Sequence, residues 1–184
     1  MSGKLVWEKK LAIEKVLPSL IEGLVVEKGI VYAGSGKGLC AIDVKSGNEI
    51  WRNKDWNQNQ GSTATMSLDN GVLISSSHWG ALYGNDAATG KKLWSMEKNG
   101  IRHRSSSAVM QGNVFYLASD ESLFLMETKT GRILMQKKLP FSVNVASSPL
   151  VTDKELIFGT ASEGIVALDR ETWTEKWRYR TGES

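Results

Sequence analysis

The sequence predicts an all-β fold, a β-propeller built of four-stranded antiparallel blades. Two observations carry this prediction: one turn recurs with a period of about 42 residues, and short runs of alternating apolar and polar residues surround each copy of it. A fixed period of this length indicates stacked equivalent units, and four short strands in about 40 residues are typical of one propeller blade. We therefore expect about four blades.

The recurring turn has the pattern Asp-x-x-x-Gly. It first appears in "AIDVKSGNEIW" (41–51) and returns in "GNDAATGKKLW" (84–94), "LMETKTGRILM" (125–135) and "ALDRETWTEKW" (167–177). An Asp before a reversal accepts hydrogen bonds from backbone N–H groups further along, and Gly supplies the positive φ of a tight turn. The structural repeat residues are Asp43, Gly47, Trp51, Asp86, Gly90, Trp94, Glu127, Gly131, Asp169 and Trp177.

A tryptophan follows the turn glycine by four residues on the outermost strand. There a large indole can pack between one blade and the next while its N–H finds a backbone acceptor. The sequence therefore predicts Trp51, Trp94 and Trp177 between or against neighbouring sheets. Three positions depart from the pattern, since Glu127 replaces the Asp, Met135 replaces the tryptophan and Trp173 replaces the glycine.

The repeats divide the chain into one propeller over residues 1–184, with units at approximately 19–54, 62–97, 104–138 and 146–180. "SGKLVW" (2–7) repeats "SGNEIW" (46–51), so residues 3–10 are predicted to be an orphan outer strand. This pattern indicates a segment of a larger propeller, a partial or half ring. Terminal units would leave sheet faces uncovered, and either further blades of a longer parent or a second copy should cover them. For the isolated segment we expect self-association through the terminal blades, which loss of Trp7 should weaken.

Composition excludes several classes of function. The net charge of +3 is small and the basic residues are scattered, which argues against nucleic acid and anionic membranes as partners. No stretch approaches the roughly 20 apolar residues of a membrane span, and the N-terminus lacks the apolar core of a signal peptide. The single Cys40 excludes an internal disulfide and is expected to be buried filler.

Two stretches carry a family resemblance. "GIVYAGSGKGLCAIDVKSGNEIW" (29–51) and "SSPLVTDKELIFGTASEGIVALD" (147–169) resemble the pyrroloquinoline-quinone-type, or quinoprotein-like, propeller repeat. That repeat is shared by quinoprotein dehydrogenases, by the propeller lipoprotein of the outer-membrane barrel-assembly machinery, and by propellers appended to kinases or phosphoesterases. The resemblance implies a propeller fold and a periplasmic or extracellular location, but it does not choose among these functions.

The same resemblance tests the enzyme hypothesis. Alcohol-oxidising members carry a vicinal disulfide over the quinone, an opposing tryptophan, and a Ca²⁺ held by Glu, Asn and Asp. This chain has one cysteine, and no Glu/Asn/Asp set matches those ligands. We therefore expect no catalytic residue, no metal and no cofactor here, with pyrroloquinoline quinone suggested by resemblance only. The "SGKG" stretch (35–38) is predicted to be a hairpin turn, not a phosphate loop.

Unusual residues gather in three loops. In this topology, the loops between units leave the same face as the loops joining each unit's second and third strands. The sequence places both histidines there, with two tryptophans for which the repeat has no use. Aromatic and Arg side chains on a rigid scaffold are typical of binding surfaces. The candidate binding residues are Trp56, Asn57, His78, Trp79, Arg102, His103 and Arg104.

The leading hypothesis is a non-catalytic scaffold or recognition module that binds a protein, peptide or glycan through this loop face. One alternative is a segment of a quinoprotein dehydrogenase whose cofactor ligands lie outside these residues. Another is an accessory propeller domain of a hydrolase. A vicinal cysteine pair and an acidic metal site in a longer parent chain would favour the dehydrogenase, and a lipoprotein signal or an adjoining catalytic domain would favour the scaffold.

Overall fold

The computed structural model describes residues 3–9, 24–35, 38–56, 66–76, 81–97, 107–143, 148–180 and 182, and this part of the chain contains sixteen strands and no helix. Blade 1 comprises β1 (Leu24–Glu27), β2 (Ile30–Ser35), β3 (Gly38–Asp43) and β4 (Glu49–Asn53). Blade 2 comprises β5 (Ser67–Asp69), β6 (Val72–Ser76), β7 (Leu82–Asp86) and β8 (Lys92–Met96). Blade 3 comprises β9 (Ala108–Met110), β10 (Asn113–Leu117), β11 (Ser122–Glu127) and β12 (Ile133–Lys138). Blade 4 comprises β13 (Leu150–Val151), β14 (Glu155–Gly159), β15 (Ile165–Asp169) and β16 (Glu175–Tyr179).

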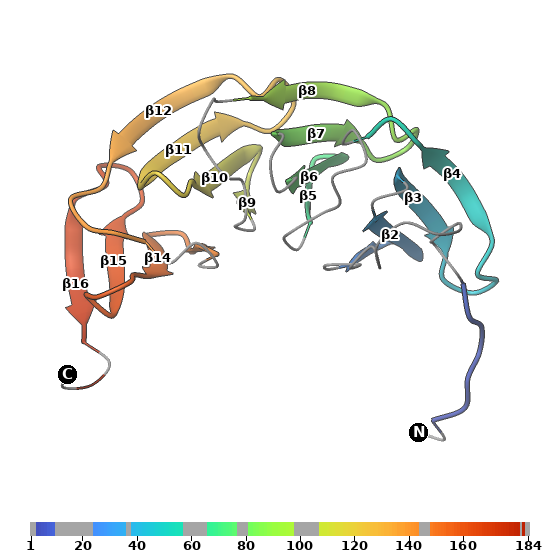
Figure 1. Ribbon diagram of the computed structural model, residues 1–184, viewed down its shortest axis with the longest axis horizontal. Coiled ribbons are helices and arrows are strands. Elements are labelled where there is room, and N and C mark those ends of the chain that lie inside the picture. Colours follow the sequence, from blue (N-terminus) through green and yellow to red (C-terminus); the bar gives the residue numbers. More distant parts are fainter. Residues whose placement is uncertain are drawn as a thin grey trace.

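Each blade is an antiparallel sheet whose strands pair in chain order. The four blades stand side by side in an open arc, with β4, β8, β12 and β16 along its outer rim (Figure 1). The all-β propeller prediction is therefore confirmed. No described helix is long and apolar enough to span a membrane.

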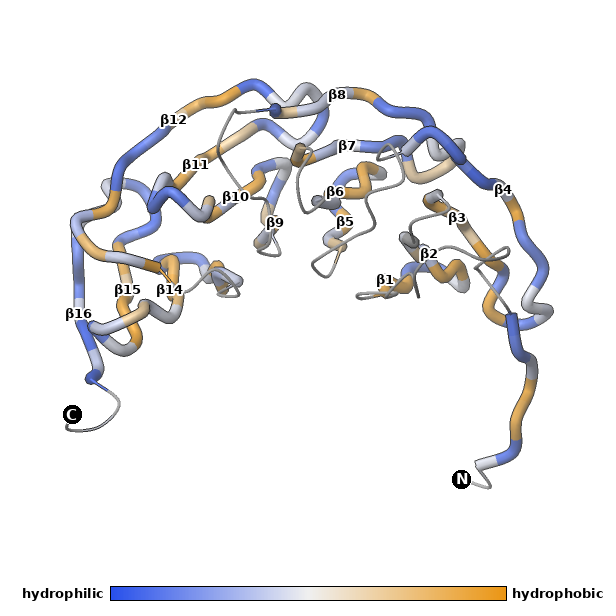
Figure 2. Tube along the Cα trace, in the orientation of Figure 1, coloured by the Kyte–Doolittle hydropathy of each residue, from blue (hydrophilic) through white to orange (hydrophobic). Residues whose placement is uncertain are grey.

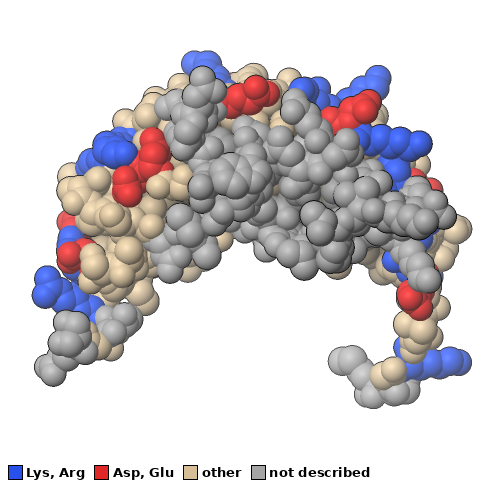
Figure 3. Space-filling model, viewed as in Figure 1, with Lys and Arg blue, Asp and Glu red and all other residues tan. Residues whose placement is uncertain are grey.

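The inner and outer strands differ in polarity, as Figure 2 shows for the apolar β2, β3 and β15 against the largely polar β16. The middle strands of blades 2 and 3 are buried on both faces because each of these blades packs between two others. In β6, for example, all five residues are buried, whereas β12 is mostly exposed. Along the rim, Lys and Arg side chains are interspersed with Asp and Glu on the described part of the face in Figure 3.

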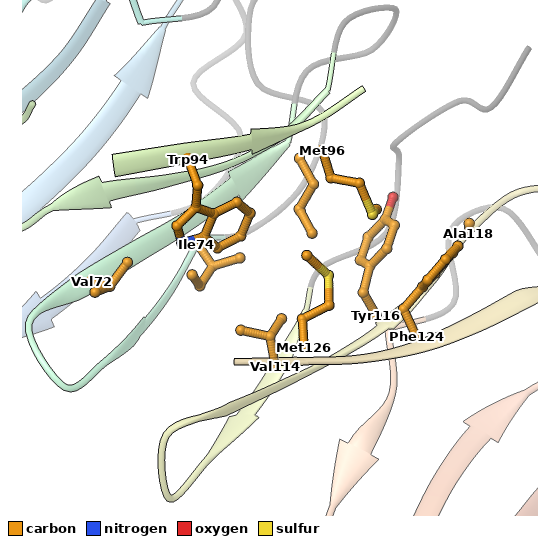
Figure 4. Packing of buried hydrophobic residues seen from close by; sticks show 10 residues of the cluster. Val72, Ile74, Trp94, Met96, Val114, Tyr116, Ala118, Phe124 and Met126 are labelled. Carbon is orange, nitrogen blue, oxygen red and sulfur yellow. The ribbon is translucent and has the colours of Figure 1, made fainter. Parts of the chain in front are cut away.

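The hydrophobic core is divided among the joints between successive blades. Side chains alternate along a strand, so each blade presents one apolar face to the blade before it and the other to the blade after it. Figure 4 shows the joint between blades 2 and 3, where Trp94 and Met96 of β8 lie near Met126 and Tyr116 of blade 3. These four side chains are buried, and equivalent clusters fill the other two joints.

Every outer strand contains a β-bulge near its start, at the same place in each blade. The register shifts between Ala41 and Ile42 in blade 1, and at the equivalent pair in each of the other blades. Immediately before the shift, Ala41 pairs with Trp51 and Ala167 pairs with Trp177. The bulge thus aims the residue at this position of each outer strand toward the next blade.

The acidic turns have the predicted geometry. The Asp43 carboxylate accepts hydrogen bonds from the Lys45 N–H at 3.1 Å, the Ser46 N–H at 2.7 Å and the Ser46 hydroxyl at 2.8 Å. These bonds, first the backbone bond and then the side-chain bond from Ser46, hold the pKa of Asp43 below its usual value. The Thr172 N–H and hydroxyl lower the pKa of Asp169 in the same way.

The third turn replaces this network. Glu127 has a longer side chain, and its carboxylate accepts the Thr130 hydroxyl and forms an ion pair with Arg132 at 3.7 Å. The backbone bond from Gly131 N–H to the Glu127 carbonyl, at 2.9 Å, keeps the turn closed. The Asp-to-Glu change therefore leaves the backbone of the turn as in the other blades.

The N-terminal prediction needs a correction. The described residues 3–9 form no strand, although residues 3–10 were expected to be an outer strand. A strand needs a hydrogen-bonded neighbour, and the part of the chain that the structure describes pairs none with this segment. The segment nevertheless lies on the outer rim at the blade 1 end of the arc (Figure 1).

Candidate functional site

A tryptophan joins each of the first two blades to the next. The Trp51 indole N–H of blade 1 donates to the Ala87 carbonyl of blade 2 at 3.1 Å. The Trp94 N–H of blade 2 donates to the Thr128 carbonyl of blade 3 at 2.8 Å. In both cases the acceptor is the residue directly after the acidic turn residue, so the repeat supplies both halves of the contact.

The turn glycine provides the surface on which each indole lies. A Cβ on Gly90 would come within 2.5 Å of the Trp51 ring, and one on Gly131 within 2.5 Å of the Trp94 ring. Both glycines also have a positive φ, 75° and 68°, that side chains rarely adopt. Glycine is therefore required at each of these positions for two reasons, the positive φ of the turn and the close approach of the indole.

The joint between blades 3 and 4 contains two of the residues that depart from the repeat. Met135 occupies the position of the docking tryptophan, and Trp173 occupies the position of the turn glycine. Both belong to the same hydrophobic cluster, in which Trp173 is fully buried at a φ of 56°. The two unusual residues thus compensate each other, because one indole still fills the joint.

The exchange has a polar consequence. The Trp173 N–H is buried without a hydrogen-bond partner among the described residues. The carbonyl of Trp173 instead accepts the Lys137 ammonium at 2.8 Å, as the Gly90 carbonyl accepts the Asn53 amide at 2.8 Å. The hydrogen bond from an outer-strand side chain to the carbonyl at the turn-glycine position of the next blade is therefore kept at this joint. The hydrogen bond of the indole N–H is lost.

Blade 1 receives an indole from the N-terminal segment. The Trp7 N–H donates to the Val44 carbonyl at 2.6 Å, and its ring covers Gly47. Trp7 also packs against the buried cluster that contains Cys40. Cys40 is 1% exposed, and the pKa of its thiol is raised, chiefly by burial. The expectation that Cys40 is buried is confirmed.

The last docking tryptophan has no turn to cover among the described residues. Trp177 remains 39% exposed, and its N–H donates at 3.3 Å to the Glu155 carboxylate of its own blade. The prediction that it packs against a neighbouring sheet is therefore wrong within this chain, although its place in β16 is as expected.

The candidate loops leave the blades at one edge of the arc. In blade 2, Ser76 at the end of β6 pairs with Leu82 at the start of β7, which pairs with Met96 at the end of β8. The Ser67 hydroxyl of β5 donates to the carbonyl of Ser107, just before β9. Residues 57–65, 77–80 and 98–106 all connect strand ends on this edge, in adjacent blades.

Trp56 has a structural role that sequence reasoning missed. It is 1% exposed, and its N–H donates to the Ser75 hydroxyl of blade 2 at 2.9 Å. A Cβ on Gly34 would come within 2.4 Å of its ring. The expectation that Trp56 has no use in the repeat and lies in an open binding surface is therefore wrong. The signal was Gly34, because a glycine inside a strand often marks a close approach.

The other six candidate binding residues are Asn57, His78, Trp79, Arg102, His103 and Arg104, and all of them lie outside the described residues. Within the described part, no group of three His, Cys, Asp or Glu side chains is placed to hold a metal ion. The polar side chains that remain beside the loop edge include the buried Ser75, Ser76 and Ser107.

A family model described as outer membrane protein assembly factor BamB matches residues 1–96 and again residues 80–184. The chain belongs to this family. The solved structure of BamB from Moraxella catarrhalis superposes with a TM-score of 0.71 at 18% identity, covering 87% of this chain and 53% of that one. Family membership and shared fold therefore agree on a propeller of quinoprotein-like repeats.

Enzymes carry similar repeats. A quinone-dependent alcohol dehydrogenase subunit of Gluconobacter oxydans is 27% identical over 152 residues, which are 69% of this chain and 20% of that protein. A tetrathionate hydrolase of Acidithiobacillus ferrooxidans is 25% identical over 140 residues, 75% of this chain and 26% of that protein. The chain thus spans about a fifth to a quarter of the length of these relatives, whose activities differ.

Proposed function

We propose that this chain is a recognition scaffold that binds a protein or peptide through the loop edge, with a glycan as the other ligand of suitable chemistry. The observation that carries the proposal is the shared edge of three loops from adjacent blades. These loops hold Trp79, Arg102 and four further candidate residues. Aromatic and Arg side chains dominate the energetics of protein interfaces.

The cross-blade contacts support this role physically. Trp56, Trp51 and Trp94 each link one blade to the next, so the strand ends that carry the loops are held at fixed relative positions. A rigid base lowers the conformational entropy lost when loops bind a partner. The family's description as an assembly factor fits a protein partner and a location outside the cytoplasm.

The test uses site-specific photo-crosslinking of the full chain in its native cells. A benzophenone amino acid is placed at position 79 or 102, and matched controls carry it at exposed positions 45 or 129 on the turns of the opposite edge. A discrete protein adduct from 79 and 102 but not from 45 and 129 supports the proposal. The same adducts from all four positions, or none from 79 and 102, would overturn it.

A second candidate function is a segment of a quinone-dependent dehydrogenase. The observation favouring it is the 27% identity to the Gluconobacter dehydrogenase subunit. Calorimetric titration with pyrroloquinoline quinone and Ca²⁺ separates the two candidates. Stoichiometric binding would favour the dehydrogenase, and no heat of binding together with a loop-edge adduct would favour the scaffold.

A further inference from the structure

The outer rim of blades 1–3 carries an exposed aliphatic side chain at the same place in each blade. Ile50 in β4, Leu93 in β8 and Leu134 in β12 are 52%, 48% and 43% exposed. Figure 2 shows apolar stretches within these otherwise polar outer strands. The strands follow one another along the convex side of the arc (Figure 1). This row is therefore separate from the two end faces and does not depend on what covers them.

The β-bulge of each outer strand places these side chains at the surface. In blade 1 the pairing with β3 passes from Trp51 directly to Glu49, so Ile50 is the extra residue of the bulge. Leu93 and Leu134 are the extra residues in β8 and β12. A bulge re-aims the side chains at its position. The docking position that follows is directed toward the next blade, while the aliphatic residue before it stays exposed.

Blade 4 indicates that the fold does not require an aliphatic residue at this position. Its extra bulge residue is Lys176, whose ammonium forms an ion pair with the Glu155 carboxylate at 3.2 Å. The same bulge thus forms around a charged side chain. Apolar surface that is exposed without a structural need is typical of an interaction site.

Positive charge accompanies the aliphatic row. The turns and outer strands of blades 1–3, residues 43–54, 86–97 and 127–138, contain nine Lys and Arg against five Asp and Glu. Four of the five carboxylates are held by hydrogen bonds or ion pairs within their own blade, namely those of Asp43, Glu49, Asp86 and Glu127. Four exposed lysines form no ion pair with any described residue: Lys45, Lys91, Lys92 and Lys129. The rim therefore has cations free to pair with a partner.

The joints between blades bring apolar and basic positions together along the rim. Trp51 lies over Gly90, which places the strand that carries Ile50 beside the turn that carries Lys91. The next joint repeats this arrangement, with β8 beside the turn that contains Gly131. Aliphatic and basic residues thus alternate from blade 1 to blade 3.

We infer that the rim of blades 1–3 binds an extended, acidic segment of a partner protein that also carries aliphatic residues. The carboxylates of the segment pair with the free lysines, and its aliphatic side chains pack on Ile50, Leu93 and Leu134. An extended segment can follow the convex arc, whereas a flat bilayer would touch it at one blade (Figure 1). The aliphatic row also argues against nucleic acid, whose bases stack on aromatic side chains. The inference is independent of the loop-edge proposal, since the rim carries different residues.

Fluorescence anisotropy with a defined probe tests the inference. The probe is a fluorescein-labelled peptide of about three Val-Val-Glu-Glu repeats, in which each face of the extended chain alternates between apolar and acidic side chains. We expect the full chain to bind it saturably and more weakly as salt is added, because salt screens exposed charges. Leu93→Ser and Lys92→Glu should each weaken binding at least about fivefold.

Two matched substitutions away from the rim are the controls. Leu150→Ser changes a leucine that is 60% exposed in β13, and Lys154→Glu reverses an exposed lysine in the β13–β14 turn. Both controls should bind the probe as wild type does, and circular dichroism verifies that every variant is folded. Equal losses in the controls, equal binding of a Val-Val-Lys-Lys peptide, or no binding at all would overturn the inference.

Two further measurements separate the rim from other sites. Cosedimentation with vesicles of phosphatidylglycerol and phosphatidylcholine tests a lipid surface. Vesicle binding that is lost in Leu93→Ser, without peptide binding, would assign the rim to a membrane and overturn the inference. Trp79→Ala should leave peptide binding unchanged. Loss of binding in that variant would place the peptide at the loop edge instead of the rim.

Discussion

Met135 and Trp173 share the core between blades 3 and 4, where the indole comes from the receiving turn instead of the outer strand. At the preceding joint, Trp94 of the outer strand lies over Gly131 of the receiving turn. The volume of the indole is thus conserved across the joints while its chain position changes. Because Trp173 already fills the third joint from the receiving turn, this joint has no room for the outer-strand tryptophan that the other two joints use.

A double-mutant cycle tests the exchange. Met135→Trp places a second indole against Trp173 and should destabilise by overpacking, and Trp173→Gly should destabilise by leaving a cavity. The double variant recreates the repeat and should be more stable than the sum of the single effects predicts, by about 0.5–3 kcal/mol of coupling. Denaturant midpoints measure this, and additive effects would show that the two positions are independent.

The docking tryptophans should differ sharply in their contribution to stability. Trp94 is 8% exposed with its N–H bonded, so Trp94→Ala should cost about 3–5 kcal/mol. Trp177→Ala should cost far less because Trp177 is 39% exposed. Equal losses for the two variants in urea unfolding would contradict the proposed difference between covered and open joints.

Turn glycines allow a matched comparison. Gly131 and Gly71 both have positive φ, but a Cβ at Gly131 meets the Trp94 ring at 2.5 Å, whereas one at Gly71 meets nothing within 4 Å. Gly131→Ala should therefore lower the melting temperature more than Gly71→Ala does. Since both substitutions strain the backbone similarly, the difference isolates the contact with the indole. Similar losses would show that backbone strain alone decides.

Cys40 reports on the N-terminal segment. Burial raises the pKa of its thiol and shields it, so the native protein should react slowly with a thiol reagent. Trp7 packs against the cluster that contains Cys40, and Trp7→Ala should therefore speed the labelling. Leu5→Ala, which changes an exposed side chain of the same segment, is the control. Unchanged labelling of Trp7→Ala would mean that Trp7 does not protect the thiol.

Acid should weaken the aspartate turns. The pKa of Asp43 and of Asp169 is lower in the folded chain than the usual value of about 3.9. Their contribution to stability is therefore complete above that value and is lost as pH falls through the lower folded-state pKa.

Unfolding midpoints measured from pH 6 downward test this. Asp43→Asn and Asp169→Asn should be less stable than wild type at pH 6, with a gap that shrinks below about pH 4. Asp153→Asn, at an exposed hairpin turn, provides the control. A gap that stays constant to pH 3 would rule out the charge as its cause.

The sequence by itself determined the repeat, because turn chemistry and strand alternation are local. The Asp43 turn, the positive φ of Gly47 and the outer-strand position of Trp51 all follow from residues within a few positions of one another. The family resemblance rests on the same local pattern, and the match over residues 1–96 and 80–184 agrees with it.

Only the tertiary structure decided which surfaces are covered. Trp56 is buried because Gly34, more than 20 positions earlier, leaves room for its ring, and Trp177 is exposed because no described turn lies beside it. In the sequence, Met135 and Trp173 are two separate departures from the repeat. The structure places both in the joint between blades 3 and 4. Burial depends on contacts between distant segments, and neither composition nor a local pattern encodes which segments meet.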